Sequence, residues 1–178
     1  MSSVTGREAY VIDAVRTPVG KRGGSLAGQH PADLGAHVIR AVVERTGIDP
    51  EVVDDVIFGC VDTIGPQAGN IGRSAWLAAG MPLGVPGTTV DRQCGSSQQA
   101  VHFGAQAIWS GSQDVILFGG VQNMSALPIS SAMLAGREYG FDDPFSGSTG
   151  WVERFGTQEI SQFNGAQMMA DKWEISRR

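Results

Sequence analysis

The sequence predicts a layered α/β domain with a largely parallel sheet, because strand-like and helix-like segments alternate from residue 9 to residue 120. Glycine accounts for 25 of the 178 residues, which fits many tight turns between such elements. The alternation stops after residue 120, so we expect an α/β domain over residues 1–120 and a different unit over residues 121–178.

The first predicted element is a buried strand at residues 9–15, "AYVIDAV", which are rich in β-branched side chains. Arg16-Thr17-Pro18 ends it, and a glycine-rich loop follows. A helix is predicted at residues 31–47, with Pro31 in its first turn and Gly47 at its end. Its expected apolar stripe consists of Leu34, Val38, Ala41 and Val42.

Three more strands and two more helices follow in alternation. The strands are predicted at residues 55–61, 87–93 and 114–120. One helix lies between Asn70, a plausible cap, and Gly80, a plausible terminator. The other runs from Ser96 to Gly111, and its expected apolar face consists of Val101, Ala105 and Ile108.

Residues 121–156 are rich in Ser, Gly, Pro and aromatic residues and show no sustained period. The segment is too long for a plain connection, so we expect a lid, a binding loop or an oligomer contact. Residues 157–178 look helical, and the chain stops directly after them without Gly or Pro, which suggests an interrupted protein.

Composition and charge argue against several kinds of partner and several cellular locations. The net charge is −5 and the basic residues are scattered, which argues against nucleic acid or an anionic membrane. No apolar run is long enough to span a membrane, and the start lacks the pattern of a signal peptide. Cys60 and Cys94 lie far apart with no neighbouring His, so we expect reduced thiols, a cytoplasmic protein and no metal site.

Cys94 stands where a predicted strand gives way to a predicted helix, and its position has two readings. A free cysteine is commonly buried as a small apolar side chain, and position alone favours that reading. The other reading is a nucleophile, because the positive end of a helix dipole favours the thiolate. Gly95 would let a substrate approach the backbone, and α/β sheets tend to bind ligands at this edge.

A nucleophilic cysteine needs a base, and the sequence does not supply an obvious one. His102 follows Cys94 by eight residues, about two helical turns, and cannot reach the thiol. His37 falls within the first predicted helix, whereas His30 lies in a loop with no fixed position. A self-sufficient Cys-His enzyme is therefore poorly supported.

Several segments in order resemble the thiolases, the acyl-CoA C-acyltransferases. They are "VIDAVRTPVGKRGGSLA", "GNIGRSAWLAAGMPLGVPGTTVDRQCGSSQQAV", "DVILFGGVQNMSALP" and "MMADKWEISR". The resemblance implies two similar βαβαβαββ halves, each with a mostly parallel mixed sheet, and a loop domain inserted in the first. This chain would then be a truncated member that covers most of the first half and the beginning of the loop domain.

The resemblance makes Cys94 the acyl-accepting nucleophile, with its backbone N–H in an oxyanion hole. It implies CoA and acyl-CoA as substrates and no permanently bound cofactor. The family's activating His and second Cys would lie in the missing half, which a separate C-terminal chain could supply. Homodimers or homotetramers are expected, with the strand before Cys94 near the dimer interface and residues 121–150 near tetramer contacts.

Ser97 and Gln98 stand where many thiolases have Gly and Leu. This departure puts the acyl-chain preference in doubt and suggests a degradative enzyme with an unusual substrate, either bulky or sterol-derived. The rival hypothesis is a fragment without turnover that binds acyl-CoA or a partner subunit.

Overall fold

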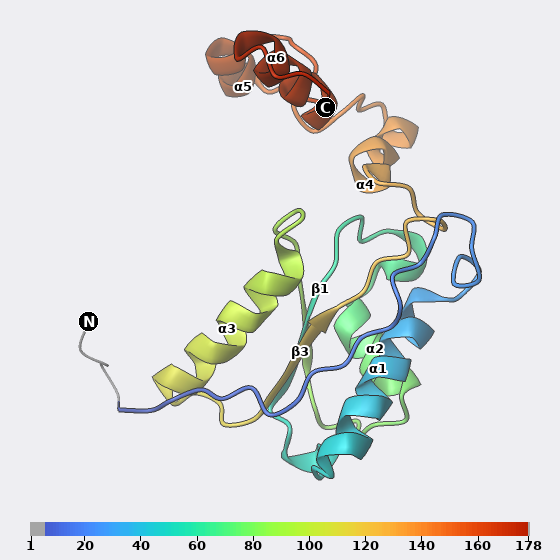
Figure 1. The fold of residues 1–178 in the computed structure, drawn as a ribbon, viewed down its shortest axis with the longest axis vertical. Coiled ribbons are helices and arrows are strands. Elements are labelled where there is room, and N and C mark those ends of the chain that lie inside the picture. Colours follow the sequence, from blue (N-terminus) through green and yellow to red (C-terminus); the bar gives the residue numbers. More distant parts are fainter. Residues whose placement is uncertain (1–5, 178) are drawn as a thin grey trace. The chain divides into compact units, whose positions relative to one another are not determined.

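The computed structural model describes residues 6–177, and the chain divides into two compact units, Met1–Ala135 and Gly136–Arg178. The first unit contains a β-sheet with helices on both faces, whereas the second unit is helical (Figure 1). The α/β class predicted for the N-terminal part is confirmed.

The sheet has three parallel strands, β1 (Asp55–Gly59), β2 (Gly87–Val90) and β3 (Ile116–Gly120), in the order β2-β1-β3. Phe58 of β1 stands opposite Thr89 of β2 and Gly119 of β3. Because the strands are parallel, their carboxyl ends meet at one edge of the sheet. The loops that follow the three strands therefore start close together.

Helices cover the sheet on both sides (Figure 1). Helices α1 (Pro31–Thr46) and α2 (Ile71–Ala78) pack together on one face, where the Phe58 side chain lies against both. Helix α3 (Ser96–Ser110) covers the other face, with Gly104 against Phe118. Each helix connects two parallel strands or leads into one, as the alternating sequence pattern predicts.

The core lies between the sheet and helices α1 and α2. Its fully buried apolar residues include Ile39, Val56, Phe58 and Trp76. The Trp76 indole Nε1–H donates a hydrogen bond to the Pro82 carbonyl at 2.7 Å, so the largest buried side chain also has its polar atom satisfied.

The helix ends follow the predicted capping chemistry. Gly47 and Gly111 end α1 and α3 in the left-handed region, with φ of 65° and 75°. Asn70 caps α2 by accepting from the Arg73 N–H.

The apolar faces predicted for α1 and α3 were wrong. Small residues bring both helices close to their neighbours, and larger side chains beside them stay half-buried. The buried residues of α1 are Pro31, Ala32, Gly35, Ala36 and Ile39, and those of α3 are Ser96, Gln99, Ala100 and Gly104.

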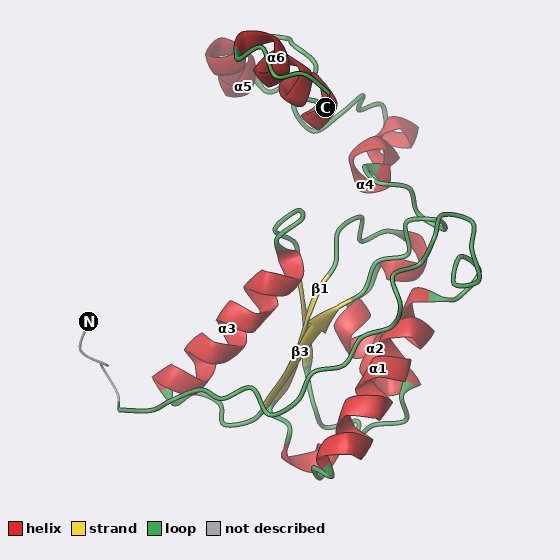
Figure 2. Cartoon of the chain, viewed as in Figure 1, coloured by secondary structure: helices red, strands yellow, loops and turns green. Residues whose placement is uncertain are grey.

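The predicted buried strand at residues 9–15 is also wrong. The segment is extended but forms no ladder and is drawn as a loop in Figure 2. Tyr10, Val11 and Ile12 are 71%, 66% and 81% exposed. A strand exists only when its backbone has a hydrogen-bonded neighbour, and β-propensity alone does not provide one.

Residues after β3 form short helices separated by turns. They are α4 (Ser131–Leu134), α5 (Thr149–Phe155) and α6 (Gln162–Lys172), with a 3-10 turn at Ala135–Tyr139. Two other 3-10 turns, at Pro50–Val52 and Gly65–Gln67, lie on either side of β1. The helix predicted near the C-terminus is present as α6. The predicted division into an α/β domain over residues 1–120 and a different unit over residues 121–178 stays a prediction. Within residues 6–177, no helix is long and apolar enough to cross a membrane.

Candidate active site

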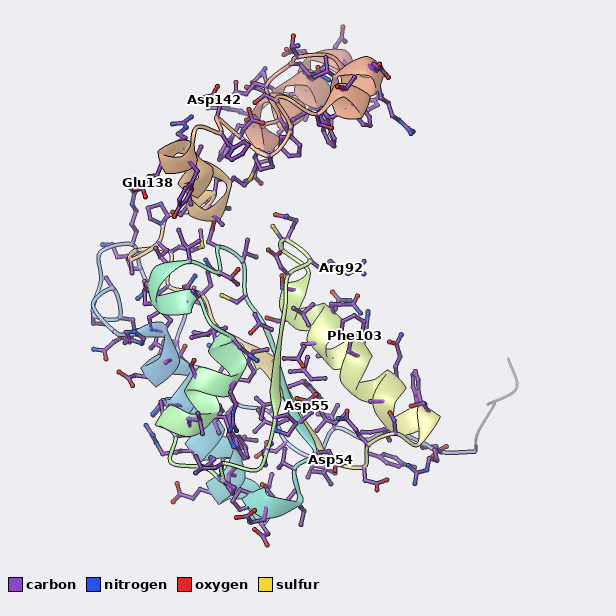
Figure 3. The ribbon with its side chains drawn as sticks, turned by 180° about the vertical axis from the view of Figure 1, so that it is seen from behind. Asp54, Asp55, Arg92, Phe103, Glu138 and Asp142 are labelled. Carbon is purple, nitrogen blue, oxygen red and sulfur yellow. The ribbon has the colours of Figure 1, made fainter. Side chains whose placement is uncertain are left out.

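Cys94 lies in the short loop that joins β2 to α3, two residues before the helix begins, and its side chain is exposed. Figure 3 marks this loop by Arg92, at the opposite end of the sheet from Asp54 and Asp55. The predicted placement at a strand-to-helix joint, at the carboxyl edge of the sheet, is therefore confirmed. The apolar-packing reading of Cys94 does not fit its exposure.

Local hydrogen bonds fix the loop around Cys94. The Ser96 hydroxyl accepts from the Arg92 N–H at 2.9 Å and donates to the Gln93 carbonyl. The Asp91 carboxylate accepts from the Gln93 N–H at 2.9 Å. Gln93 has φ of +47°, a left-handed conformation that is uncommon for a residue with a side chain. This turn presents the next residue, Cys94, to solvent.

The start of α3 lies directly on the sheet because two strand glycines leave room for it. A Cβ at Gly59 would lie 2.2 Å from the Ser97 nitrogen, and one at Gly120 would lie 2.0 Å from the Ser97 Oγ. No other residue type fits either position. The glycines thus hold the N-terminus of α3, and the Cys94 loop before it, over the carboxyl ends of β1 and β3.

The second cysteine has a different environment. Cys60 follows β1, is 2% exposed and lies in a small apolar cluster with Ala32 and Ile71. Burial, followed by the charges of Asp91 and Asp62, raises the pKa of the Cys60 thiol to about 11. Cys60 is therefore a protonated packing residue near neutral pH.

The histidines are not gathered at the thiol. His30 is the N-cap of α1, where its Nδ1 accepts from the Ala32 N–H at 3.2 Å. His37 lies on α1 and His102 on α3, and both are exposed. The continuous α3 places His102 about 9 Å along the helix axis from Ser96, out of reach of the Cys94 loop.

A buried polar network at the same edge of the sheet has no counterpart in the sequence analysis. Asn123 follows β3, and its Nδ2 donates to the carbonyls of Ala27 and Gln29 at 3.1 and 2.8 Å. The side-chain Oε1 of Gln67 accepts from the Asn123 backbone N–H at 2.8 Å. The network ties the glycine-rich loop before α1 to the carboxyl end of β3.

Asp62 extends this network after β1. The Gln67 side chain donates to the Asp62 carbonyl at 3.0 Å, while the Asp62 carboxylate accepts from the N–H groups of Ser130 and Ala132. Its side chain therefore fixes the path of the chain toward α4. No local sequence pattern marks this cluster, because its hydrogen bonds join residues far apart in the chain.

Among the residues that the structure describes, no group of three His, Cys, Asp or Glu side chains comes close enough together to hold a metal ion.

Comparison with known proteins places this arrangement in a family. The family described as "Thiolase, N-terminal domain" matches residues 9–178. The steroid 3-ketoacyl-CoA thiolase FadA6 of Mycobacterium tuberculosis is 66% identical over 170 residues, which are 96% of this chain and 42% of that protein.

A β-ketoadipyl-CoA thiolase of Escherichia coli is 36% identical over 179 residues, covering 96% of this chain and 44% of the relative. The chain thus spans less than half the length of these two relatives. The family match extends over nearly all of the chain, and the chain belongs to the thiolase family.

Proposed function

We propose that this chain carries the nucleophile of an acyl-CoA C-acyltransferase, which moves an acyl group between 3-ketoacyl-CoA and CoA. The observation that carries the proposal is the exposed thiol of Cys94, held by a hydrogen-bonded turn at the start of α3. In the same unit Cys60 is buried, so only one of the two thiols is open to a substrate.

The proposed reaction has two balanced steps. The Cys94 thiolate adds to the C3 carbonyl of a 3-ketoacyl-CoA, and the C2–C3 bond breaks. The acyl group stays on sulfur, while the departing enolate of acetyl-CoA takes a proton. The thiolate of CoA then attacks the acyl-cysteine, which releases a shortened acyl-CoA and returns Cys94 to its starting state.

The start of α3 supports both steps electrostatically. The positive end of its helix dipole lies beside Cys94 and favours negative charge on the oxygen of the tetrahedral intermediate. The Cys94 N–H is the proposed oxyanion donor from this chain. Gly95 leaves the approach to the backbone open.

The proton-transfer groups are proposed to come from protein outside this chain, because His30 is occupied as a helix cap. An activating His and a second Cys would be supplied by a C-terminal portion, within one polypeptide or as a separate subunit. Without that portion, the chain would bind or accept an acyl group and not turn over. This is the second candidate function.

The proposal also covers the substrate, the assembly and the cellular compartment. One relative is named a steroid 3-ketoacyl-CoA thiolase, and this name supports a bulky, sterol-derived acyl group as the substrate of this chain. The open edge of β2 beside the Cys94 loop suits a homodimer contact, with a tetramer as the larger form. Two free cysteines fit the reducing cytoplasm.

Isotope exchange between labelled CoA and acetyl-CoA tests the proposal when the chain is mixed with the C-terminal remainder of the 66%-identical relative, which would supply the proton-transfer groups. We expect exchange with this mixture and none when the chain in it is a Cys94→Ala variant of equal stability. Equal exchange by both proteins would refute the nucleophile. Binding of CoA with no exchange by either protein would instead support the second candidate.

A further inference from the structure

Asp55, the first residue of β1, has a carboxylate oxygen without a partner. Within residues 6–177, its Oδ1 is buried and makes no hydrogen bond. Neither of the two ion pairs among these residues includes Asp55. A buried carboxylate oxygen without a donor is costly, so a donor from another molecule would be favourable at this position.

Arg92 is an exposed cation on the same side of the sheet, and it is absent from both of those ion pairs. A Cβ on Gly95, the N-cap of α3, would lie 3.8 Å from the Arg92 Cγ, so the stem of this side chain lies on the α3 side. Asp55 is on that side too. Its neighbour Val56 belongs to the core between the sheet and α1, and successive strand residues point to opposite faces.

The two side chains cannot meet within one copy, because Arg92 and Asp55 lie at opposite ends of the sheet (Figure 3). A second copy can bring them together. Among the described strands, β2 lies at the edge of the sheet. If two copies join at this edge about a two-fold axis, their β2 strands run antiparallel. The carboxyl end of one β2 then lies beside the amino end of the other.

The hydrogen bonds of β2 show which of its residues face the open edge. The Pro86 carbonyl accepts from β1 at 3.2 Å, and the Val90 carbonyl does so at 3.1 Å. Backbone groups of successive strand residues point in opposite directions. The alternate residues Gly87, Thr89 and Asp91 therefore direct their N–H and C=O groups away from β1.

These outward groups select the position of the axis. An axis through Thr89 pairs all three outward residues with their equivalents in the second copy. The Gly87 carbonyl already accepts one side-chain hydrogen bond, and its second lone pair can accept another. An axis through Thr88 would instead set Asp91 opposite Val85, which is buried and precedes the strand.

We propose that Arg92 of each copy forms an ion pair with Asp55 of the partner subunit across this edge. The axis through Thr89 sets Arg92 opposite Pro86 of the partner subunit, and Pro86 stands beside Asp55 in the register of β2 with β1. Two strand spacings, roughly 10 Å, then separate the Cα atoms of the pair, which two extended side chains can bridge. The inference rests on the homodimer of the proposed function and adds the residues that fix its register.

The ion pair would also make the second copy part of the support of the candidate nucleophile. Arg92 lies two residues before Cys94, and its carbonyl accepts from the Gly95 N–H at 3.0 Å. Its own N–H donates to the Ser96 hydroxyl at 2.9 Å. A tethered Arg92 thus holds one side of the turn that presents Cys94, so dimerisation and the position of the thiol are coupled.

Reversal of the two charges tests the ion pair without any assay of catalysis. Sedimentation equilibrium of the 178-residue chain gives the dissociation constant of its dimer. Asp55→Arg and Arg92→Asp each place like charges together at both ion-pair positions, so each should weaken dimerisation by about tenfold or more. An equimolar mixture of the two variants can form a heterodimer with opposite charges at both positions. We expect this mixture to dimerise as the parent does.

Two further variants control the test. Glu44→Arg reverses an exposed carboxylate on α1, on the other side of the sheet, and should leave dimerisation unchanged. Recovery of dimers in the mixture shows that both charge-reversed chains fold. Asp55→Asn keeps the size of the side chain and removes its charge, so it should weaken the dimer even if Asp55→Arg fails to fold.

Dimers of Asp55→Asn and Arg92→Asp as tight as those of the parent would overturn the ion pair and leave the homodimer standing. Folded charge-reversed variants that stay monomeric when mixed would also overturn it. A parent chain that is monomeric at every concentration would refute the homodimer together with the ion pair. None of these outcomes bears on acylation of Cys94, which is measured separately.

Discussion

The Ser97 backbone nitrogen lies 2.2 Å from the position that a Cβ on Gly59 would occupy. Gly59 ends β1 and Ser97 lies in the first turn of α3, so their contact sets how far the helix descends onto the sheet. Cys94 precedes that turn and takes its position from it. Gly59 has no reactive side chain, yet its contact with Ser97 thus determines the position of the candidate nucleophile, Cys94.

Gly59→Ala should destabilise the protein by about 3 kcal/mol or more, because the added methyl group overlaps backbone atoms that cannot rotate away. The start of α3 must shift to relieve this overlap, so acylation of Cys94 should slow as well. Urea denaturation measures the first effect, and the rate of adduct formation measures the second. Gly84→Ala is the control, since a Cβ there meets nothing within 4 Å. Equal stability of both variants would contradict the role of Gly59.

Asn123→Ala should loosen the glycine-rich loop before α1. The substitution removes the hydrogen bonds to the Ala27 and Gln29 carbonyls and should cost about 2 kcal/mol. The loop carries Lys21 and Arg22, which are exposed, so trypsin should cut there several-fold faster than in the parent chain. The exposed Asn164 bonds only to Glu159 through its side chain, and Asn164→Ala should leave the cleavage rate unchanged.

Cys60 should make stability depend on pH above 9. Its pKa is raised from 9.0 to about 11, so the unfolded thiol ionises first as the pH rises. The associated stabilisation is complete below pH 9 and is lost as the pH approaches 11, by roughly 2 to 3 kcal/mol. Denaturation measured across this interval should show a shallower fall in Cys60→Ala than in the parent. Identical slopes in the two proteins would contradict a buried, protonated thiol.

Iodoacetamide at neutral pH should label Cys94 well before Cys60. Cys94 is exposed, whereas Cys60 is 2% exposed and protonated. Peptide mass spectrometry at successive times follows each thiol separately. In denaturant the two rates should converge, which serves as the control for the fold. Equal labelling of the native chain would contradict the assigned environments.

Cleavage of acetoacetyl-CoA by the 178-residue chain alone should be negligible. The described histidines do not gather at Cys94, so none of these three side chains is placed to take part in repeated proton transfer. A spectrophotometric assay of thioester cleavage measures this directly. Rates near those of ordinary enzymes would show that the chain is sufficient by itself.

Local chemistry made much of the fold predictable from sequence. The caps Asn70, Gly47 and Gly111 appear where their backbone chemistry requires them. The strands predicted at residues 55–61, 87–93 and 114–120 are present as β1, β2 and β3, and β1 contains the expected buried run. Cys94 was predicted at a strand-to-helix joint, because the change of hydrophobic period marks that boundary.

The sequence-based predictions that failed concern features that depend on contacts with residues distant in sequence. Residues 9–15 have strong β-propensity but no neighbouring backbone, so the predicted strand is absent. The packed face of α3 centres on Ala100 and Gly104, since close approach to β3 selects small residues. The network around Asn123 could not be anticipated, because hydrogen bonds across about 95 residues of sequence leave no local pattern.

Peptide mapping after incubation with acetyl-CoA tests the central claim most directly, because it identifies the residue that accepts the acyl group. The account predicts a thioester-linked acetyl group on Cys94, sensitive to hydroxylamine and removed by added CoA, with Cys60 unmodified. An acetyl group on Cys60 or on a lysine, with Cys94 unmodified in a folded chain, would contradict it.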